Sequence, residues 1–367
     1  MPLKPSRLGK AKAQSNIENV AILYQYMKPL FSIIIPVTRQ GGVLALISSL
    51  SGQTGFNKEK WEIFFVLSES IKIRHETIPF ASSLIFEENR HPSLRRNIAV
   101  NNCSGNWLVF LDDDVVLEKD YLSVIENTVL FFGNKFDIFT GPQQNANLKK
   151  NTFSLLNLLK NHALATTRKT KGDMAELKFY EISLCNCVIK KQAFDDAGGF
   201  NDLANYQIDD TEFFYIALGL GYKAAFLKNL MINHVYPTSF IKFLLDRAKK
   251  RFFTGFNSIL FIEIYSKIPF YKLAWGVNLA VALAYFLRFR FPLLWLVIAD
   301  IVLLIILTPK KHDLPFLIRL LQAFLTPLDH LISLFSFTFG CIVSMICFAF
   351  KQRIIINKKK RLAVLKP

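Results

Sequence analysis

The chain has 367 residues, of which 51% are hydrophobic, and it carries a formal net charge of +17 at pH 7. This length is enough for one large domain or two ordinary ones with a substantial core. The positive charge favours an anionic lipid surface or an anionic substrate such as a nucleoside diphosphate, whereas nucleic acid is disfavoured because no recognition motif for it is present. The five cysteines form no metal-type pairs, so we expect reduced thiols.

Composition divides the chain into four regions. Residues 1–30 form a basic arm without an apolar core, which argues against a signal peptide. Residues 31–265 have the apolar runs and polar loops of a globular domain. Long apolar stretches follow in residues 266–350, and residues 351–367 form a basic tail.

The first half of the globular region alternates strands and helices. The runs FSIIIPV, WEIFFVL and WLVFL predict three buried strands. Between them, GGVLALISSLSGQ predicts a helix, and SLRRNIAVNNCSG predicts another with Ser93 as its N-cap and Gly105 closing it. This α/β order predicts a mainly parallel sheet covered on both faces, in which ligands bind beyond the carboxyl ends of the strands.

The second half is less regular. NTFSLLNLLKNHALATT predicts a helix, EISLCNCVIKKQAF a strand running into a helix, and GGFND a turn. DDTEFFYIALGLGY predicts a helix that opens with acids, as the helix dipole favours, and AAFLKNLMI is strand-like. RAKKRFFTGF predicts a basic helix next to the apolar region.

Three aspartates follow the third strand in WLVFLDDDVV. Asp112 and Asp114 lie two residues apart on the loop that leaves the strand, so their carboxylates can point toward one site. Hard carboxylate oxygens at this spacing suit a Mn²⁺ or Mg²⁺ ion that in turn binds phosphate oxygens. A solvated acidic turn is the alternative interpretation.

The order of these motifs resembles the family 2 glycosyltransferases over about residues 31–260. The motifs that carry the resemblance are FSIIIPV, LISSLSGQT, WEIFFVL, RRNIAVNNCSGNWLVFLDDD, GGFND, DDTEFFYIALGLGY and NHV. The resemblance implies a GT-A type fold, with a nucleotide-sugar half in residues 31–150 and an acceptor half in residues 151–265. It also implies a nucleotide-sugar donor and a divalent cation, Mn or Mg.

The same resemblance implies roles for individual residues. The catalytic base would be Asp210, with Asp209 as the fallback, and helix N-capping alone is the alternative role of these two acids. The metal ligands would be Asp112, Asp114 and His234, and a purely structural role for this histidine stays open. Contacts to the nucleotide sugar would come from Pro36, Glu69, Arg96, Asn97, Asp112, Asp113, Arg247 and Arg251.

Two departures from the family pattern affect the donor and the product. The family usually ends its second strand in an acid that reads the nucleobase, but here Leu67 and Ser68 precede Glu69, so the base is left open. The processive Gln-x-x-Arg-Trp motif is replaced by residues 248–252, AKKRF, which favours transfer of a single sugar. The basic residues Arg247, Lys250 and Arg251 would bind either the diphosphate or anionic lipid headgroups.

The apolar region predicts C-terminal transmembrane helices at residues 271–287, 291–307 and 331–350. Buried core helices are the alternative. Basic residues favour a cytosolic location for the loop at residues 308–312 and for the C-terminal tail. The number of membrane crossings stays open. We therefore expect a multi-pass protein of the cytoplasmic membrane, with its catalytic domain facing the cytoplasm and membrane lipid around its helices.

These observations predict an inverting, metal-dependent glycosyltransferase that moves one sugar to a lipid-linked or cell-surface glycan acceptor. Two other functions stay open. A nucleotidyltransferase shares the fold and the Asp-x-Asp chemistry, and PVTRQGGV supplies a weak version of its glycine-rich loop with Arg39. A non-catalytic membrane binding or assembly subunit is the other.

Overall fold

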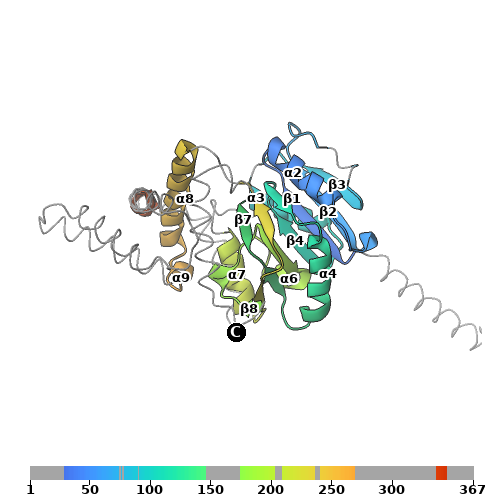
Figure 1. Ribbon diagram of the computed structural model, residues 1–367. Coiled ribbons are helices and arrows are strands. Elements are labelled where there is room, and N and C mark those ends of the chain that lie inside the picture. Colours follow the sequence, from blue (N-terminus) through green and yellow to red (C-terminus); the bar gives the residue numbers. More distant parts are fainter. Residues whose placement is uncertain are drawn as a thin grey trace, which may run out of the picture.

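The structure is a computed structural model that describes residues 29–73, 76, 78–89, 91–145, 174–202, 209–235, 240–268 and 336–344. These residues form an α/β domain, with helices α8 and α9 and the helical residues 336–344 beside it (Figure 1). The basic arm, the predicted helix within residues 151–167 and the predicted membrane segments at 271–287 and 291–307 lie outside the described residues, as does most of 331–350.

An eight-stranded mixed sheet with the strand order β3-β2-β1-β4-β9-β6-β10-β8 forms the centre of the domain. Strands β3, β2, β1 and β4 pair in parallel, and so do β6 and β10. Strand β9 runs antiparallel to both of its neighbours, and β8 runs antiparallel to β10. The strands are β1 (Phe31–Pro36), β2 (Trp61–Leu67), β3 (Ala81–Phe86), β4 (Trp107–Leu111), β6 (Ile138–Thr140), β8 (Met174–Glu176), β9 (Asn186–Lys190) and β10 (Ala224–Leu227).

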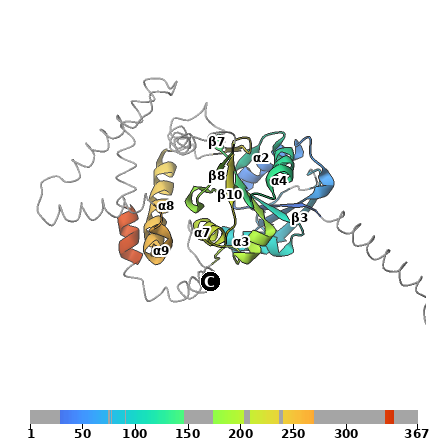
Figure 2. The ribbon, with the colours of Figure 1, turned by 90° about the horizontal axis from the view of Figure 1, so that it is seen from below.

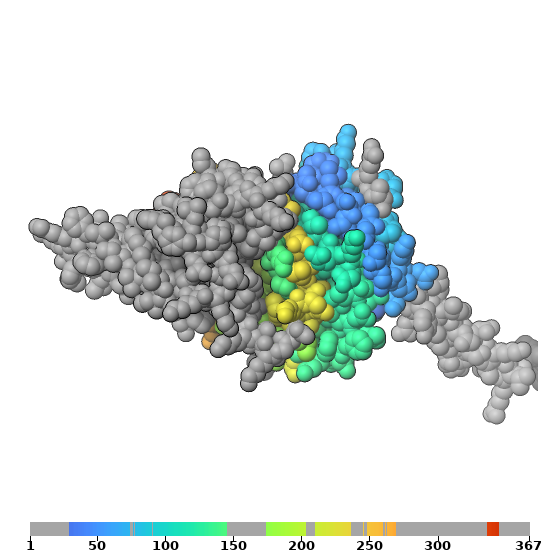
Figure 3. Space-filling view, viewed as in Figure 1, coloured from blue at the N-terminus to red at the C-terminus, as the bar shows by residue number. Residues whose placement is uncertain are grey.

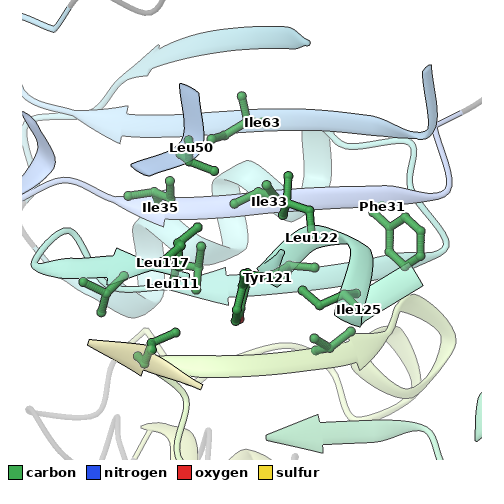
Figure 4. Close-up of a cluster of buried hydrophobic side chains, with 14 of the residues drawn as sticks. Phe31, Ile33, Ile35, Leu50, Ile63, Leu111, Leu117, Tyr121, Leu122 and Ile125 are labelled. Atoms are coloured by element: carbon green, nitrogen blue, oxygen red, sulfur yellow. The ribbon is translucent and has the colours of Figure 1, made fainter. Parts of the chain in front are cut away.

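Helices cover both faces of this sheet because its central strands are apolar on both sides. Alternate residues of β1 enter different cores: Ile33 and Ile35 pack with α2 and α4, whereas Ile34 packs with α3, α6 and α7. Figure 4 shows the first of these cores, where Tyr121 and Ile125 of α4 lie against the sheet. The helices are α2 (Gln40–Ser51), α3 (Pro92–Asn102), α4 (Tyr121–Phe132), α6 (Lys191–Asp196) and α7 (Asp209–Gly219), and a 3-10 turn, η1 (Lys58–Lys60), leads into β2.

A second, three-stranded sheet brings distant parts of the chain together. Its strand β11 (Ile232–His234) lies between β5 (Val115–Leu117) and β7 (Gln143–Asn145). The pairing places His234 opposite Val115, the residue that follows the aspartate triplet. Figure 3 shows this side of the molecule, where green atoms from the middle of the chain and yellow atoms from its later part meet.

Helices α8 (Phe240–Leu260) and α9 (Ile262–Tyr265) follow the domain and lie to the same side of it in both ribbon views (Figure 2). Residues of α9 pack on Phe179 and Tyr180 of a 3-10 turn, η3 (Phe179–Glu181), and on α7. Helical residues 336–344 cross α8 closely, because a Cβ at Gly255 would meet the Phe337 carbonyl oxygen at 2.0 Å. Within the described part of the chain, no helix combines the length and the apolar character needed to span a bilayer.

The fold agrees with the predicted α/β class and with most of the predicted elements. Two details are wrong. Helix α3 begins at Pro92 with His91 as its N-cap, not at Ser93, because proline is well suited to the first helical position. The helix ends at Asn102 with Cys103 as its C-cap, so Gly105 does not close it. Strand β3 and helix α4 were not predicted.

Candidate metal and nucleotide-sugar site

The candidate site lies at the carboxyl end of β4. Strands β1, β2 and β4 are parallel, so the residues that follow them gather at one edge of the sheet. These are the loop from Thr38 to Arg39, Ser68, and the three aspartates that begin at Asp112.

The three consecutive aspartates have different partners, because successive side chains point in different directions. Asp112 accepts a hydrogen bond from Nη2 of Arg96 at 2.9 Å, and its side chain is 33% exposed. Asp114 is nearly buried and forms an ion pair with Arg39. Burial raises the pKa of the Asp114 carboxyl above its usual value, and this effect outweighs the lowering by the nearby charges of His234 and Arg39.

Asp113 holds the loop between β1 and α2. Its Oδ2 accepts hydrogen bonds from the Thr38 N–H at 2.6 Å, the Thr38 hydroxyl at 2.8 Å and the Arg39 N–H at 2.9 Å. Its other oxygen lies 3.2 Å from Nη2 of Arg39, and its side chain is only 4% exposed. These contacts hold Asp113 against the loop, and its predicted contact with the nucleotide stays a prediction.

The three predicted metal ligands come together in the structure. One ligand atom each from Asp112, Asp114 and His234 lies within 4.8 Å of the others. Two carboxylates and an imidazole are a donor set that suits a divalent ion such as Mn²⁺ or Mg²⁺, so the residues present fit the implied cation. The identity of the metal is not fixed by this set.

The small sheet places His234 in this group. Strand β11 ends at this residue, and the following Val235 N–H donates to the Asp114 carbonyl oxygen at 2.8 Å. As a result, Nε2 of His234 lies 3.3 Å from Oδ1 of Asp114. Backbone pairing on both sides of the aspartate therefore fixes the distance between ligands 120 residues apart in sequence.

Helix α3 supports the site through consecutive side chains. Arg96 reaches Asp112 and also lies with its guanidinium carbon 6.0 Å from the centre of the Phe200 ring. The Asn97 amide binds the backbone of Phe200 twice, donating to its carbonyl at 2.8 Å and accepting from its N–H at 3.0 Å. Gly198 and Gly199 before it have φ values of 74° and 66°, which glycine adopts without strain.

This turn leads to the helix that carries the predicted catalytic base. Asn201 follows the turn, is fully buried, and donates to the buried Glu212 of α7 at 2.8 Å. Asp210 accepts a hydrogen bond from the Thr211 N–H at 2.7 Å in the first turn of α7. Burial, and to a smaller extent the charge of Asp210, raise the pKa of Cys187, a β9 residue that pairs with Phe110 of β4.

For the remaining predicted site residues, the structure describes no contact with the candidate metal ligands. Pro36 ends β1 and is buried, and Glu69 is exposed after β2, with its N–H donating to Glu88 at 3.0 Å. Arg247 and Arg251 lie in α8, but the side chain of Arg247 and that of Asp209 are outside the described part. For all of these residues, and for Asn97, a contact with the nucleotide sugar or acceptor stays a prediction.

Sequence reasoning missed three residues around the site. Arg39 was noted only as part of a weak glycine-rich loop, yet it contacts Asp113 and Asp114. The buried Arg95 donates to the carbonyls of Val37, Glu87 at 2.7 Å and Asn89 at 2.9 Å, and so joins the ends of β1 and β3. Burial, the largest cause, and the charge of Asp112 raise the pKa of Cys185, which keeps this thiol protonated.

Comparisons with known proteins agree with this arrangement. Residues 32–198 match the family model described as glycosyl transferase family 2. No curated protein sequence matches the chain. The mannosyltransferase PcManGT from Pyrobaculum calidifontis, solved in complex with GDP-Man and Mn²⁺, aligns with a TM-score of 0.55 and 15% identity over 86% of this chain and 87% of that chain. This likeness supports the GT-A type fold.

Two structures of TarS from S. aureus are also similar. One covers residues 1–349 of TarS in complex with UDP and aligns with a TM-score of 0.43 and 15% identity, over 69% of this chain and 78% of that chain. The other aligns with a TM-score of 0.42 and 16% identity, over 64% of this chain but only 40% of that chain. Together with the fold, the family match supports a glycosyl transferase family 2 domain over residues 32–198.

Proposed function

We propose that the protein is an inverting, metal-dependent glycosyltransferase that moves a single sugar from a nucleotide sugar to a lipid-linked or cell-surface glycan acceptor. The observation that carries the proposal is the convergence of Asp112, Asp114 and His234 at the carboxyl end of β4. The GDP-Man and Mn²⁺ that accompany the Pyrobaculum calidifontis structure support a nucleotide-sugar donor and a divalent cation for this chain as well.

In this proposal the acid cluster holds the donor diphosphate through a cation. Asp112, Asp114 and His234 would hold a Mn²⁺ or Mg²⁺ ion, which when bound neutralises the diphosphate as negative charge builds on it. Arg96 keeps Asp112 in place, and the pairing of β11 with β5 keeps His234 in place. These supports reduce the rearrangement that the site needs when the donor binds.

Asp210 is the proposed general base. It would accept the proton of the acceptor hydroxyl while that oxygen forms a bond to the anomeric carbon, and the bond from this carbon to the diphosphate oxygen would break on the opposite face. The nucleoside diphosphate leaves with the electron pair of the broken bond. The Thr211 N–H, which donates to Oδ1, orients the carboxylate for this step.

A membrane location is part of the proposal and rests on the sequence. The apolar runs at 271–287, 291–307 and 331–350, flanked by basic residues, favour a multi-pass protein of the cytoplasmic membrane with its catalytic domain in the cytoplasm. On α8, which precedes them, Lys249 and Lys250 are exposed, as is suitable near anionic headgroups. A lipid-linked acceptor would then meet the site at the membrane surface.

The test is nucleoside diphosphate release from a panel of nucleotide sugars, with Mn²⁺ or Mg²⁺, by the full chain in the presence of a lipid extract. We expect cation-dependent release from one donor. Asp210→Asn should still bind that donor but lose turnover by at least about a hundred-fold, because it removes the general base. Asp195→Asn, which changes an exposed acid of α6, is the matched control and should leave turnover unchanged.

The alternative functions give different results in the same assay. A binding or assembly subunit would bind a nucleotide sugar without releasing product, and Asp210→Asn would then have no effect on any measured rate. A nucleotidyltransferase would release pyrophosphate from a nucleoside triphosphate and not a nucleoside diphosphate from a nucleotide sugar. Either result would contradict the proposed function.

A further inference from the structure

Arg39 contacts two of the three consecutive aspartates, and neither the family pattern nor the proposed mechanism gives it a role. It lies in the loop after β1, which ends at Pro36, and serves as the N-cap residue of α2, with extended backbone angles. Its Nη2 contacts both Asp113, at 3.2 Å, and Asp114. It is therefore a partly exposed cation in contact with Asp114, one of the candidate metal ligands.

The backbone of Arg39 is fixed independently of its guanidinium group. The Arg39 N–H, the Thr38 N–H and the Thr38 hydroxyl all donate to Oδ2 of Asp113, which is almost fully buried. A Cβ at Gly42 would meet the Asp113 carbonyl oxygen at 2.7 Å, so the first turn of α2 also lies directly against the triplet. Substitution of the Arg39 side chain would leave these anchors in place.

The guanidinium group itself is only partly used. Each contact that the structure describes for it within the chain starts at Nη2. The side chain is 56% exposed, whereas those of Asp113 and Asp114 are 4% and 11% exposed. Arginine offers five N–H donors in a planar fork that matches phosphate oxygens, and the contacts described with Asp113 and Asp114 use only Nη2.

The charges around Arg39 favour an anion that arrives together with a cation. Two carboxylates contact Nη2, and the first turn of α2, which follows Arg39, contains no acidic residue. A Cβ at Gly41 in this turn would meet nothing within 4 Å, so the space next to it is open. The N-terminal end of a helix also favours negative charge.

We propose that Arg39 binds the diphosphate of the nucleotide-sugar donor, with Nη2 remaining on Asp113 and Asp114 and with Nε and Nη1 donating to phosphate oxygens. This inference rests on the proposed function and extends it. Arg39 and the cation would then bind the same diphosphate from neighbouring positions, and Asp114 would contact both. Charge-assisted hydrogen bonds to phosphate are among the stronger ones in proteins.

The proposal makes opposite predictions for cation binding and for diphosphate binding. In Arg39→Gln, loss of a positive charge next to Asp114 should leave Mn²⁺ affinity unchanged or increase it. The affinity for inorganic pyrophosphate at a fixed free Mn²⁺ concentration should fall by roughly ten- to a hundred-fold, as expected for loss of charged hydrogen bonds. The pyrophosphate affinity of Arg39→Lys should lie between those of the unmodified chain and Arg39→Gln, because an ammonium group keeps the charge but not the planar set of N–H donors.

Calorimetric titration of the full chain with Mn²⁺ alone, and then with pyrophosphate, measures both quantities without knowledge of the donor. Lys58→Gln, which removes a cation from η1 at the opposite end of β2, is the matched control and should change neither. Unchanged pyrophosphate affinity in Arg39→Gln would overturn the inference. A parallel loss of Mn²⁺ and pyrophosphate affinity would overturn it too, since Arg39 would then only orient Asp114.

The same titrations separate this inference from the proposed function. If the unmodified chain binds neither Mn²⁺ nor pyrophosphate, the proposed function fails, and the inference about Arg39 fails with it. If the unmodified chain binds both, and Arg39→Gln binds pyrophosphate equally well, only the role of Arg39 is wrong.

Discussion

Nη2 of Arg96 donates to Oδ1 of Asp112 across 2.9 Å, and this contact joins the middle of α3 to the carboxyl end of β4. The neighbours of Arg96 on α3 bind other parts of the same edge. Arg95 holds the carbonyl groups that follow β1 and β3, and Asn97 holds the backbone of Phe200. One helical turn thus fixes the donor side of the site and the turn that leads toward α7.

The contact between Asn97 and Phe200 gives a first prediction. Asn97→Ala leaves the N–H and the carbonyl of a buried residue without their partner, so we expect the free energy of unfolding to fall by about 3 kcal/mol. Asn97→Asp keeps the acceptor but places a carboxylate beside the Phe200 carbonyl. Its destabilisation should therefore be smaller at acid pH, where the protonated carboxyl can donate. Urea denaturation at several pH values measures both effects, and an unchanged stability of Asn97→Ala would contradict the structural role.

Strands that are buried on both sides could be predicted from the sequence, because a short run of apolar β-branched residues is typical of a buried strand. β1, β2 and β4 are of this kind. Strand β3 could not be predicted, since ASSLIF lies at the edge of the sheet and alternates between exposed and half-buried residues. The three-residue strands β5, β7 and β11 are too short for any periodicity, although they place His234 in the site.

The residues of the site could be predicted where a sequence motif fixes their spacing. They could not be predicted where the direction of a side chain decides which residue it contacts. Asp112 and Asp114 converge as their spacing indicates, and His234 joins them. Asp113 lies between them in sequence but binds the loop at Thr38, which the sequence alone does not reveal. The role of Arg39 was also hidden, because its partners follow it by more than 70 residues.

Gly105 provides a test of the close packing at the amino ends of β1 and β4, opposite the candidate site. A Cβ there would lie 2.4 Å from the Ser32 Oγ and 2.7 Å from the Ser32 backbone nitrogen. We expect Gly105→Ala to lower the free energy of unfolding by about 1 to 3 kcal/mol, as overpacking does. Gly52→Ala is the matched control, because its nearest contacts are ordinary, at 3.6 and 3.7 Å. Equal melting temperatures for the two variants would show that the backbone next to Ser32 shifts to accommodate the new Cβ without loss of stability.

The three candidate metal ligands predict that substitution of any one of them weakens cation binding. Asp114→Asn, Asp112→Asn and His234→Gln should each weaken Mn²⁺ binding by at least about ten-fold, because each removes a ligand atom or its charge. Titration followed by the electron paramagnetic resonance signal of free Mn²⁺ measures this directly and does not depend on turnover. Asp195→Asn is again the control. Mn²⁺ affinity that is unchanged in all three variants would place any cation elsewhere.

Asp114 also makes stability depend on pH and on the cation. Burial raises its pKa, whereas an aspartate in the unfolded chain ionises near pH 3.9. The stabilising contribution of the protonated carboxyl is therefore fully present below about pH 3.9 and is lost as the pH rises through the raised folded pKa. Above that pH the charged carboxylate costs the fold stability when no cation is bound. Asp114→Asn should then melt at a higher temperature than the unmodified chain at pH 7 in a chelator, and this difference should disappear near pH 3.

Saturating Mn²⁺ should reverse the order at pH 7, because a cation that binds only the folded chain stabilises the unmodified protein more than the variant. Differential scanning fluorimetry across pH 3 to 8, with chelator and with Mn²⁺, gives all of these values on one protein preparation. A lower melting temperature of Asp114→Asn in chelator at pH 7 would mean that the ion pair with Arg39 outweighs burial. The carboxylate of Asp114 would then be stabilising in the fold even without a cation, and its presence at this position would need no functional reason.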